Sequence, residues 1–193
     1  MPTTPYHHGN LRAELIRVTL EVIGREGPTG VSLRAVAKHC GVSHGAPAHH
    51  FGDKAGLLTA VAAEGFGLLA DALAQAREET DDFAEVGVAY VRFAVDHRAH
   101  FEVMFRPELY RPEDPSVVEH SSRAAAELSA GSAASVGKGA ATDSEAGFAS
   151  LAAWSLVHGL ATLWNDGNLD KDLAGDDPVV AAREVTRLLG RSG

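Results

Sequence analysis

The chain has 193 residues, of which 45% are hydrophobic and 22% charged, and its formal net charge is −9. These proportions predict one globular domain or two small ones with a sizeable core, and they exclude a disordered chain. The single cysteine, Cys40, excludes an intrachain disulfide and a multi-cysteine zinc site, which favours a reducing compartment. No secretory signal or membrane span is evident from the residue pattern. We therefore expect a cytoplasmic protein.

Charge is distributed unevenly along the chain. Residues 1–54 contain six Lys/Arg and four Asp/Glu, a net charge of +2, whereas residues 55–193 contain 11 and 22, a net charge of −11. Six of the ten histidines also lie in the first 54 residues, so acidification makes this end more positive. A mildly basic head therefore precedes an acidic body.

Apolar spacing predicts about nine helices and no sheet, so the expected fold class is all-α. The expected helices cover Leu11 to the Gly27-Pro28 break, 32–40, 43–50, the Asp53 cap to beyond Leu73, Phe83 to Phe93, 101–105, 116–128, 145–165 and 178–189. The Gly/Ser/Ala-rich stretch 129–143 is expected to be a connecting loop, with extension of either neighbouring helix as the alternative.

Two short helices, 32–40 and 43–50, joined by Gly41-Val42, predict a helix-turn-helix motif at about residues 32–51. Ser32 is placed to open the first helix, and Gly41 is placed to supply the left-handed turn that closes it. The second helix is too polar to be core. Its residues Ser43, His44, Gly45 and His49 are small or hydrogen-bonding, as an element that enters the major groove of DNA requires. The alternative is that these histidines only cover a solvated turn.

Lys54 supports the DNA interpretation from a different direction. A cation in the first turn of a helix is disfavoured by the helix dipole unless an anion, such as a DNA phosphate, lies there. Two interpretations remain open for Arg34 and for an amino-terminal arm with His7, His8 and Arg12. These residues either contact the DNA backbone or minor groove or lie on a solvated face.

The run GVSLRAVAKHCGVSHGAPAHHFGDKAGLL, residues 30–58, resembles the DNA-binding domain of the TetR family of transcriptional regulators. The resemblance rests on the Gly-Val-Ser turn, the His50-Phe51 pair and the following Lys54. Phe51 is expected to anchor the second helix in the core of the head. The residues expected to contact DNA are Arg34, Ser43, His44, Gly45, His49, His50 and Lys54.

The run WSLVHGLATL, residues 154–163, is similar to the Trp-His-Gly type of carboxy-terminal domain in one branch of that family. The resemblance implies a DNA-binding head, residues 1–54, on a ligand-binding and dimerisation domain, residues 55–193. It also implies a repressor that is released from its operator by a small molecule. Two positions depart from the family pattern. Ala48 and His49 replace a phosphate-contacting aromatic residue that often precedes the His-Phe pair, and Arg98 replaces a proline.

A candidate ligand pocket is formed by aromatic residues at helical spacing. His97, Phe101 and Phe105 recur every four residues, as do Trp154 and His158 on a later helix, so each set predicts one aromatic face with a polar group. The full set of expected pocket residues is Phe66, Phe93, His97, Phe101, Met104, Phe105, Trp154 and His158. Pocket and plain hydrophobic core remain alternatives.

Other site chemistries have weaker support. His97 and His100, with His120 or His158, are a candidate metal or haem set, but their spacing alone is a weak signal, and we expect no metal or cofactor. No nucleophile, phosphate-loop or metal-hydrolase motif is present, so we expect no enzyme. The expected protein is a ligand-responsive repressor that binds a pseudo-palindromic operator as a dimer through its last two helices. The alternative is a helical sensor or protein-interaction module that has lost DNA binding.

Overall fold

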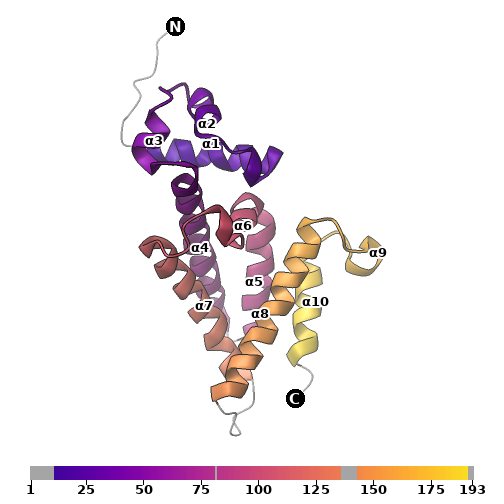
Figure 1. Ribbon diagram of the computed structural model, residues 1–193. Coiled ribbons are helices and arrows are strands. Elements are labelled where there is room, and N and C mark those ends of the chain that lie inside the picture. Colours follow the sequence, from indigo (N-terminus) through magenta and orange to yellow (C-terminus); the bar gives the residue numbers. More distant parts are fainter. Residues whose placement is uncertain (1–10, 81, 136–142, 191–193) are drawn as a thin grey trace. The chain divides into compact units, whose positions relative to one another are not determined.

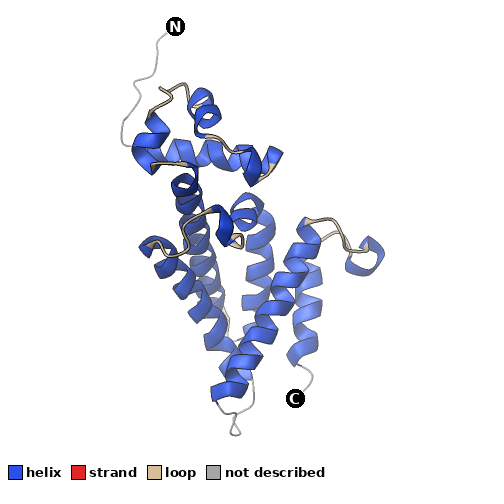
Figure 2. Cartoon of the chain, in the orientation of Figure 1, coloured by secondary structure: helices blue, strands red, loops and turns tan. Residues whose placement is uncertain are grey.

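The computed structural model describes residues 11–80, 82–135 and 143–190, and this part of the chain is helical without a strand (Figures 1 and 2). The expected all-α fold is confirmed. The α-helices of the described residues are α1 (Leu11–Glu26), α2 (Leu33–His39), α3 (Ala46–Phe51), α4 (Lys54–Glu79), α5 (Phe83–Asp96), α6 (Arg98–Met104), α7 (Pro115–Ser135), α8 (Asp143–Asn165), α9 (Lys171–Ala174) and α10 (Pro178–Gly190). Two short 3₁₀ helices, η2 (Pro28–Gly30) and η3 (Pro107–Leu109), follow α1 and α6.

Three boundaries differ from the sequence expectation. The second helix of the motif begins at Ala46 rather than Ser43. The helix through Phe93 ends at Asp96, because His97 has φ −114° and ψ 39° and α6 begins after it. Helix α7 continues through the alanine-rich stretch to Ser135, which was the alternative to a loop; residues 136–142 lie outside the described residues.

The chain divides into two compact units. The first contains the described residues of 1–64 and 99–117, and the second contains those of 65–98 and 118–193. Helix α4 contributes residues to both. The segment 99–117, which includes most of α6 and the stretch leading to α7, therefore groups with the amino-terminal helices.

The first unit is built on the apolar face of α1. Helix α1 contacts η2, α2 and α3, and α2 contacts α3. The apolar side chains of this first expected helix lie inside, since Leu15, Val18 and Val22 are all buried. The core is completed by Ile16, Ile23, Val31, Val36, Ala37, Leu57, Leu58 and Val61. This core holds the helix-turn-helix in place.

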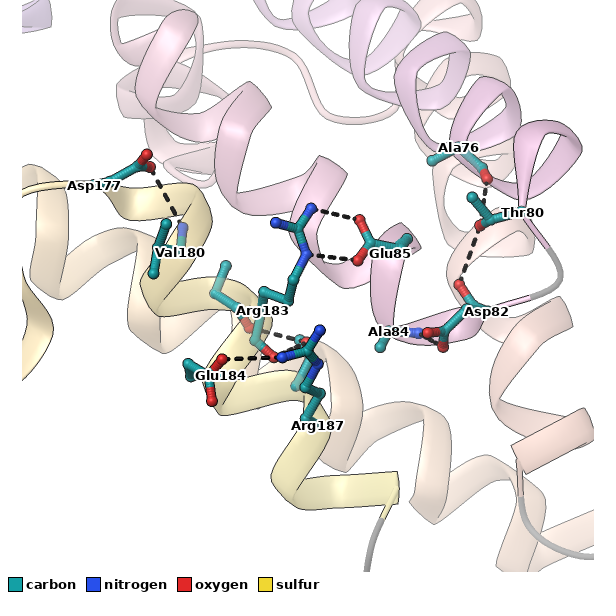
Figure 3. Close-up of polar contacts among 12 residues, drawn as sticks. Ala76, Thr80, Asp82, Ala84, Glu85, Asp177, Val180, Arg183, Glu184 and Arg187 are labelled. Atoms are coloured by element: carbon teal, nitrogen blue, oxygen red, sulfur yellow. Dashed lines mark hydrogen bonds and ion pairs between the residues drawn. The ribbon is translucent and has the colours of Figure 1, made fainter.

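The second unit contains the mutually packed helices α5, α8 and α10. The helices α5 and α10 are also joined by a two-pronged ion pair, in which the Arg183 guanidinium donates to the two carboxylate oxygens of Glu85 over 2.8 and 2.9 Å (Figure 3). Two ion pairs join α4 and α7 in the same unit. Arg77 pairs with Glu127, and Arg123 pairs with Asp71. Buried side chains of the three-helix group include Val86, Tyr90, Val91, Val157, Ala161 and Ala182.

Two helices are long and apolar enough to pass a length and hydropathy criterion for a membrane span, contrary to the sequence expectation: Lys54–Glu79 and Ser144–Asn165. In α4, 61% of the most apolar window is buried inside the protein, as expected for a core helix. In α8 only 11% of it is buried. Helix α8 therefore keeps an apolar surface that the described part of the chain does not cover.

Candidate nucleic-acid interface

Helix α2 is closed at both ends by the residues that the sequence analysis singled out. The Ser32 hydroxyl accepts a hydrogen bond from the Ala35 N–H over 3.2 Å, which is a normal N-cap. Beyond the helix, Gly41 has φ 66°, and the Gly41 and Val42 N–H groups donate to the carbonyls of Lys38 and Ala37. This is a Schellman turn, which requires a residue in the left-handed region, and glycine adopts that conformation without strain. The turn sets the direction in which α3 begins.

Helix α3 is short, because a turn precedes it and Gly52, with φ 78°, ends it. Ser43, His44 and Gly45 form a turn before it, in which the Ala46 N–H donates to the Ser43 carbonyl. Pro47 therefore lies in the first turn of α3, where its missing N–H costs no helical hydrogen bond. It is also buried. At 100° per residue, His49 points away from Pro47 and the half-buried Phe51, and so faces solvent.

The structure gathers most of the expected DNA-contacting residues on the exposed surface of this motif. Six of the seven are exposed: Arg34, Ser43, His44, Gly45, His49 and His50. Ala48 is exposed as well. A surface of small and hydrogen-bonding side chains on a helix-turn-helix has the form that a DNA groove accepts.

Exposed cations lie on the helices of this first unit. Arg34 and Lys38 on α2 are exposed and form no ion pair with any residue of the described ranges. Arg12 of α1 lies over the Phe51 ring, with its guanidinium carbon 5.4 Å from the ring centroid. The other two residues of the predicted arm, His7 and His8, lie outside the described residues. Lys38 was not among the sequence candidates, although its place in the last turn of an exposed helix could have identified it.

Lys54 has an intramolecular partner, which the sequence analysis did not foresee. Its ammonium group donates to the Thr29 carbonyl over 3.0 Å. The adjacent Asp53 carboxylate accepts from the Gly56 N–H over 2.8 Å and so caps α4, as expected. The Asp53 carboxylate therefore supplies the negative charge that offsets a lysine in the first turn of a helix. A DNA phosphate is no longer required to explain a lysine at this position.

Arg111 is a residue that sequence reasoning missed. It lies in the stretch between η3 and α7, and its guanidinium donates to the second Asp53 carboxylate oxygen over 2.8 Å. Its backbone N–H donates to the Thr59 hydroxyl over 3.0 Å. The Gly56 N–H first, and Arg111 after it, hold the pKa of Asp53 below its usual range. The residue thus fixes the start of α4, and no local pattern indicates a partner 58 positions away in the sequence.

The expected pocket residues belong to both compact units of the chain. In the first unit, the rings of Phe101 and Phe105 are in contact, with centroids 5.0 Å apart. Met104, which lies between them in the sequence, is buried. In the second unit, Phe93 stacks on His97 with centroids 4.9 Å apart, and Phe66 is buried. The helix break at His97 means that His97, Phe101 and Phe105 do not share one helical face, so that part of the spacing argument was wrong.

Trp154 and His158 do come together, around a residue that sequence reasoning missed. The fully buried Tyr90 hydroxyl lies 2.9 Å from His158 Nδ1 and accepts from Trp154 Nε1 over 3.4 Å. Burial lowers the pKa of His158, so the neutral imidazole is favoured. Burial also raises the pKa of Tyr90. The result is an uncharged polar chain between α5 and α8.

The histidines considered for metal binding are not clustered. Within the described ranges, no group of three or more His, Cys, Asp or Glu side chains is arranged to hold a metal ion. His100 is buried and its Nε2 lies 3.0 Å from the Glu64 carboxylate. His120 packs against Gly67, and its Nδ1 is buried without a hydrogen-bond partner among the described residues.

Comparisons with known proteins agree with this geometry. Residues 15–61 match the family described as bacterial regulatory proteins, tetR family, and residues 83–188 match the tetracyclin repressor-like carboxy-terminal domain. The HTH-type transcriptional regulator BetI of Stenotrophomonas maltophilia is 38% identical over 71 residues, which cover 37% of this chain and 36% of BetI. The chain thus spans about a third of the length of this curated relative.

Solved structures match over nearly the whole chain. A protein of unknown function from Rhodococcus sp. RHA1 is 32% identical with a TM-score of 0.80, and the match covers 98% of both chains. The TetR family regulator PfmR from Thermus thermophilus shares the fold, with 20% identity and a TM-score of 0.67 over 97% of both chains. The fold and the interface define the class of helix-turn-helix regulators with an all-helical carboxy-terminal part. The chain belongs to the TetR family.

Proposed function

We propose that the protein is a ligand-responsive repressor that binds a pseudo-palindromic operator as a dimer. The observation that carries the proposal is the exposed surface of α2, α3 and the turn between them, where six of the seven expected contact residues face solvent. In this proposal residues 1–54 bind DNA, and residues 55–193 bind the effector and form the dimer. The protein acts in the cytoplasm and catalyses no reaction.

The uncovered face of α8 supports dimerisation. Its large apolar residues are Phe148, 69% exposed, Leu151, 51% exposed, and Leu163, 45% exposed. At 100° per residue they lie on the same side of the helix as Ser155 and Gly159. A Cβ built at Gly159 meets nothing within 4 Å. Small residues flanked by large apolar ones allow a second helix to approach closely, as in a four-helix bundle made by α8 and α10 of two protomers.

The effector is proposed to bind in the body, near the neutral polar chain of Tyr90, Trp154 and His158. Buried aromatic surface with few hydrogen-bonding groups is typical of sites for small organic molecules. Because α4 has residues in both units, a ligand that alters its tilt changes the spacing of two DNA-binding heads. Derepression of about 100-fold needs about 2.7 kcal/mol of preference for the released state.

A pair of arginine substitutions on α8 tests the dimer. Gly159→Arg places a charge on the uncovered face and is expected to give monomers in sedimentation experiments and to abolish operator binding. Gly147→Arg is the comparison at the edge of this face, because a Cβ at Gly147 also meets nothing within 4 Å and the position lies about 100° from Phe148 and about 40° from Leu151 around the helix. It should weaken the dimer less than Gly159→Arg does. Dimers that persist in Gly159→Arg would reject this interface.

Selection of bound duplexes from fragmented genomic DNA tests operator recognition. We expect enrichment of sites with two half-sites about one helical turn apart, or a multiple of it. Half-sites of arbitrary spacing would contradict a rigid dimer. If no duplex is enriched, the exposed Ala48 marks a head that has lost DNA binding, and the protein is a helical sensor or interaction module instead.

A further inference from the structure

The helix-turn-helix carries an unusual number of imidazoles. Residues 32–54 contain His39, His44, His49 and His50, all of them exposed. The same segment has three Lys/Arg and one acidic residue, Asp53, so its net charge is +2 with neutral histidines. Protonation of these four side chains would raise the charge to +6. Histidine is the residue type of this segment that ordinarily changes its charge between pH 5 and 8.

Three of these histidines are free to meet a ligand. His44, His49 and His50 form no hydrogen bond with any described residue, and the His49 and His50 rings meet edge to face with centroids 5.7 Å apart. We refer to these three side chains as the imidazole surface. His39 differs, because its Nδ1 lies 2.8 Å from the Ala35 carbonyl and must donate to it.

The charged groups around the imidazole surface are mostly cationic. Helix α1 contributes Arg12, over the Phe51 ring, and its acidic Glu14 and Glu21 are held by Arg17. Glu26 lies at the far end of α1. Helix α2 contributes Arg34 and Lys38. Helix α4 contributes Lys54, bonded to the Thr29 carbonyl, and before it Asp53 is bonded to the Gly56 N–H and to Arg111. No described acidic side chain is bonded to an imidazole of this surface.

Resting on the proposed function, we propose that the imidazole surface binds DNA in its protonated form, so that operator binding takes up protons and strengthens as pH falls. A neutral imidazole has one N–H donor, whereas the protonated ring has two donors and a positive charge. DNA phosphates, and the guanine N7 and O6 acceptors in the major groove, are partners for such donors. The negative potential of DNA favours the protonated ring, just as an opposite charge favours the charged form inside a protein.

The size and sign of the effect follow from proton linkage. Histidine is the side-chain type whose ordinary charge change falls between pH 5 and 8, the range in which linked proton uptake can be measured. If binding takes up about one proton per operator, the association constant rises about tenfold for each unit that the pH falls. Lysine or arginine at these positions would give no such dependence in this range.

The test measures operator affinity of the full chain by fluorescence anisotropy between pH 6.0 and 8.0 at constant salt. We expect wild-type affinity to rise by about tenfold per pH unit on acidification. His49→Gln keeps a hydrogen-bonding side chain but cannot be protonated, so it should reduce the slope. His49→Arg is always charged, so it should bind at pH 8.0 with a gain over wild type and also show a reduced slope. A purely structural role for His49 would leave the wild-type pH slope in both variants.

His100→Gln is the matched control within the first unit, because His100 is buried and bonded to Glu64. It should keep the wild-type pH slope. The proposal is overturned if wild-type affinity is independent of pH, if the slope is lost in His100→Gln, or if it survives in the combined His44→Gln, His49→Gln, His50→Gln variant. Absence of DNA binding at every pH would instead reject the proposed function, so the two failures are distinguishable.

Discussion

Gly87→Ala tests how closely the helices of the second unit are packed. A Cβ built at Gly87 on α5 would lie 2.9 Å from Thr186 Cγ2 of α10 and 3.1 Å from Val157 Cγ1 of α8. Thr186 cannot turn away freely, because its hydroxyl donates to the Ala182 carbonyl over 2.9 Å. Overpacking of this kind costs about 1–3 kcal/mol, whereas replacing a helical glycine by alanine contributes about 0.8–1.0 kcal/mol. We therefore expect a net loss of about 1 kcal/mol.

Gly24→Ala is the control for this prediction. Gly24 is also helical, in α1, but a Cβ built there meets nothing within 4 Å. Only the propensity gain applies, so this variant should be more stable than wild type by up to about 1 kcal/mol. The two variants should differ by about 4–8 °C in midpoint when thermal unfolding is followed by circular dichroism at one protein concentration. Equal stabilisation by both substitutions would refute the close packing at Gly87.

Two further predictions concern the second unit. Tyr90→Phe removes the buried hydroxyl that lies between His158 and Trp154. It should lower the free energy of unfolding in urea by about 1 kcal/mol, because His158 Nδ1 and Trp154 Nε1 lose this hydrogen-bond partner. An unchanged urea midpoint would contradict the hydrogen-bonded chain. The Arg183 hydrogen bonds lower the pKa of Glu85, so the stabilisation from this pair is present above the ordinary glutamate pKa and is lost as the pH falls through the lower folded value. Thermal midpoints of wild type and Glu85→Gln should differ at pH 7 and converge as the pH falls through the lowered pKa of Glu85, and a constant difference would argue against the pair.

Local sequence signals were sufficient to predict where several helices of the first unit begin or end. Ser32 and Gly41 predicted the two ends of α2 because cap and left-handed turn depend on only a few neighbouring residues. Asp53 predicted the start of α4 for the same reason. The predicted start of α3 at Ser43 was wrong, because serine also favours turns and proline is tolerated in the first turn of a helix, so that Pro47 is compatible with a start at Ala46.

Long-range partners could not be predicted. Tyr90 looked like one more apolar position of α5, and only the fold brings it to His158, 68 positions later. Arg111 and Asp53 are separated by 58 positions. Separate helices were expected on the two sides of His97, but the four-residue spacing of His97, Phe101 and Phe105 was still treated as one helical face, which the end of α5 at Asp96 excludes. Such contacts depend on how helices pack, which periodicity does not specify.

Binding of the purified protein to DNA that flanks its own gene, measured by anisotropy over a series of salt concentrations, tests the central claim most directly. Wild type should bind specifically, with log K falling steeply as log salt rises, and Arg34→Ala should make the slope shallower by about one for each phosphate that the variant no longer binds. Lys54→Ala would show the same change if Lys54 exchanges the Thr29 carbonyl for a phosphate, while Arg77→Ala, in the ion pair with Glu127, should leave the slope unchanged. Weak binding with the same salt dependence in all four proteins, or no binding at all, would contradict a DNA-binding role for this helix-turn-helix.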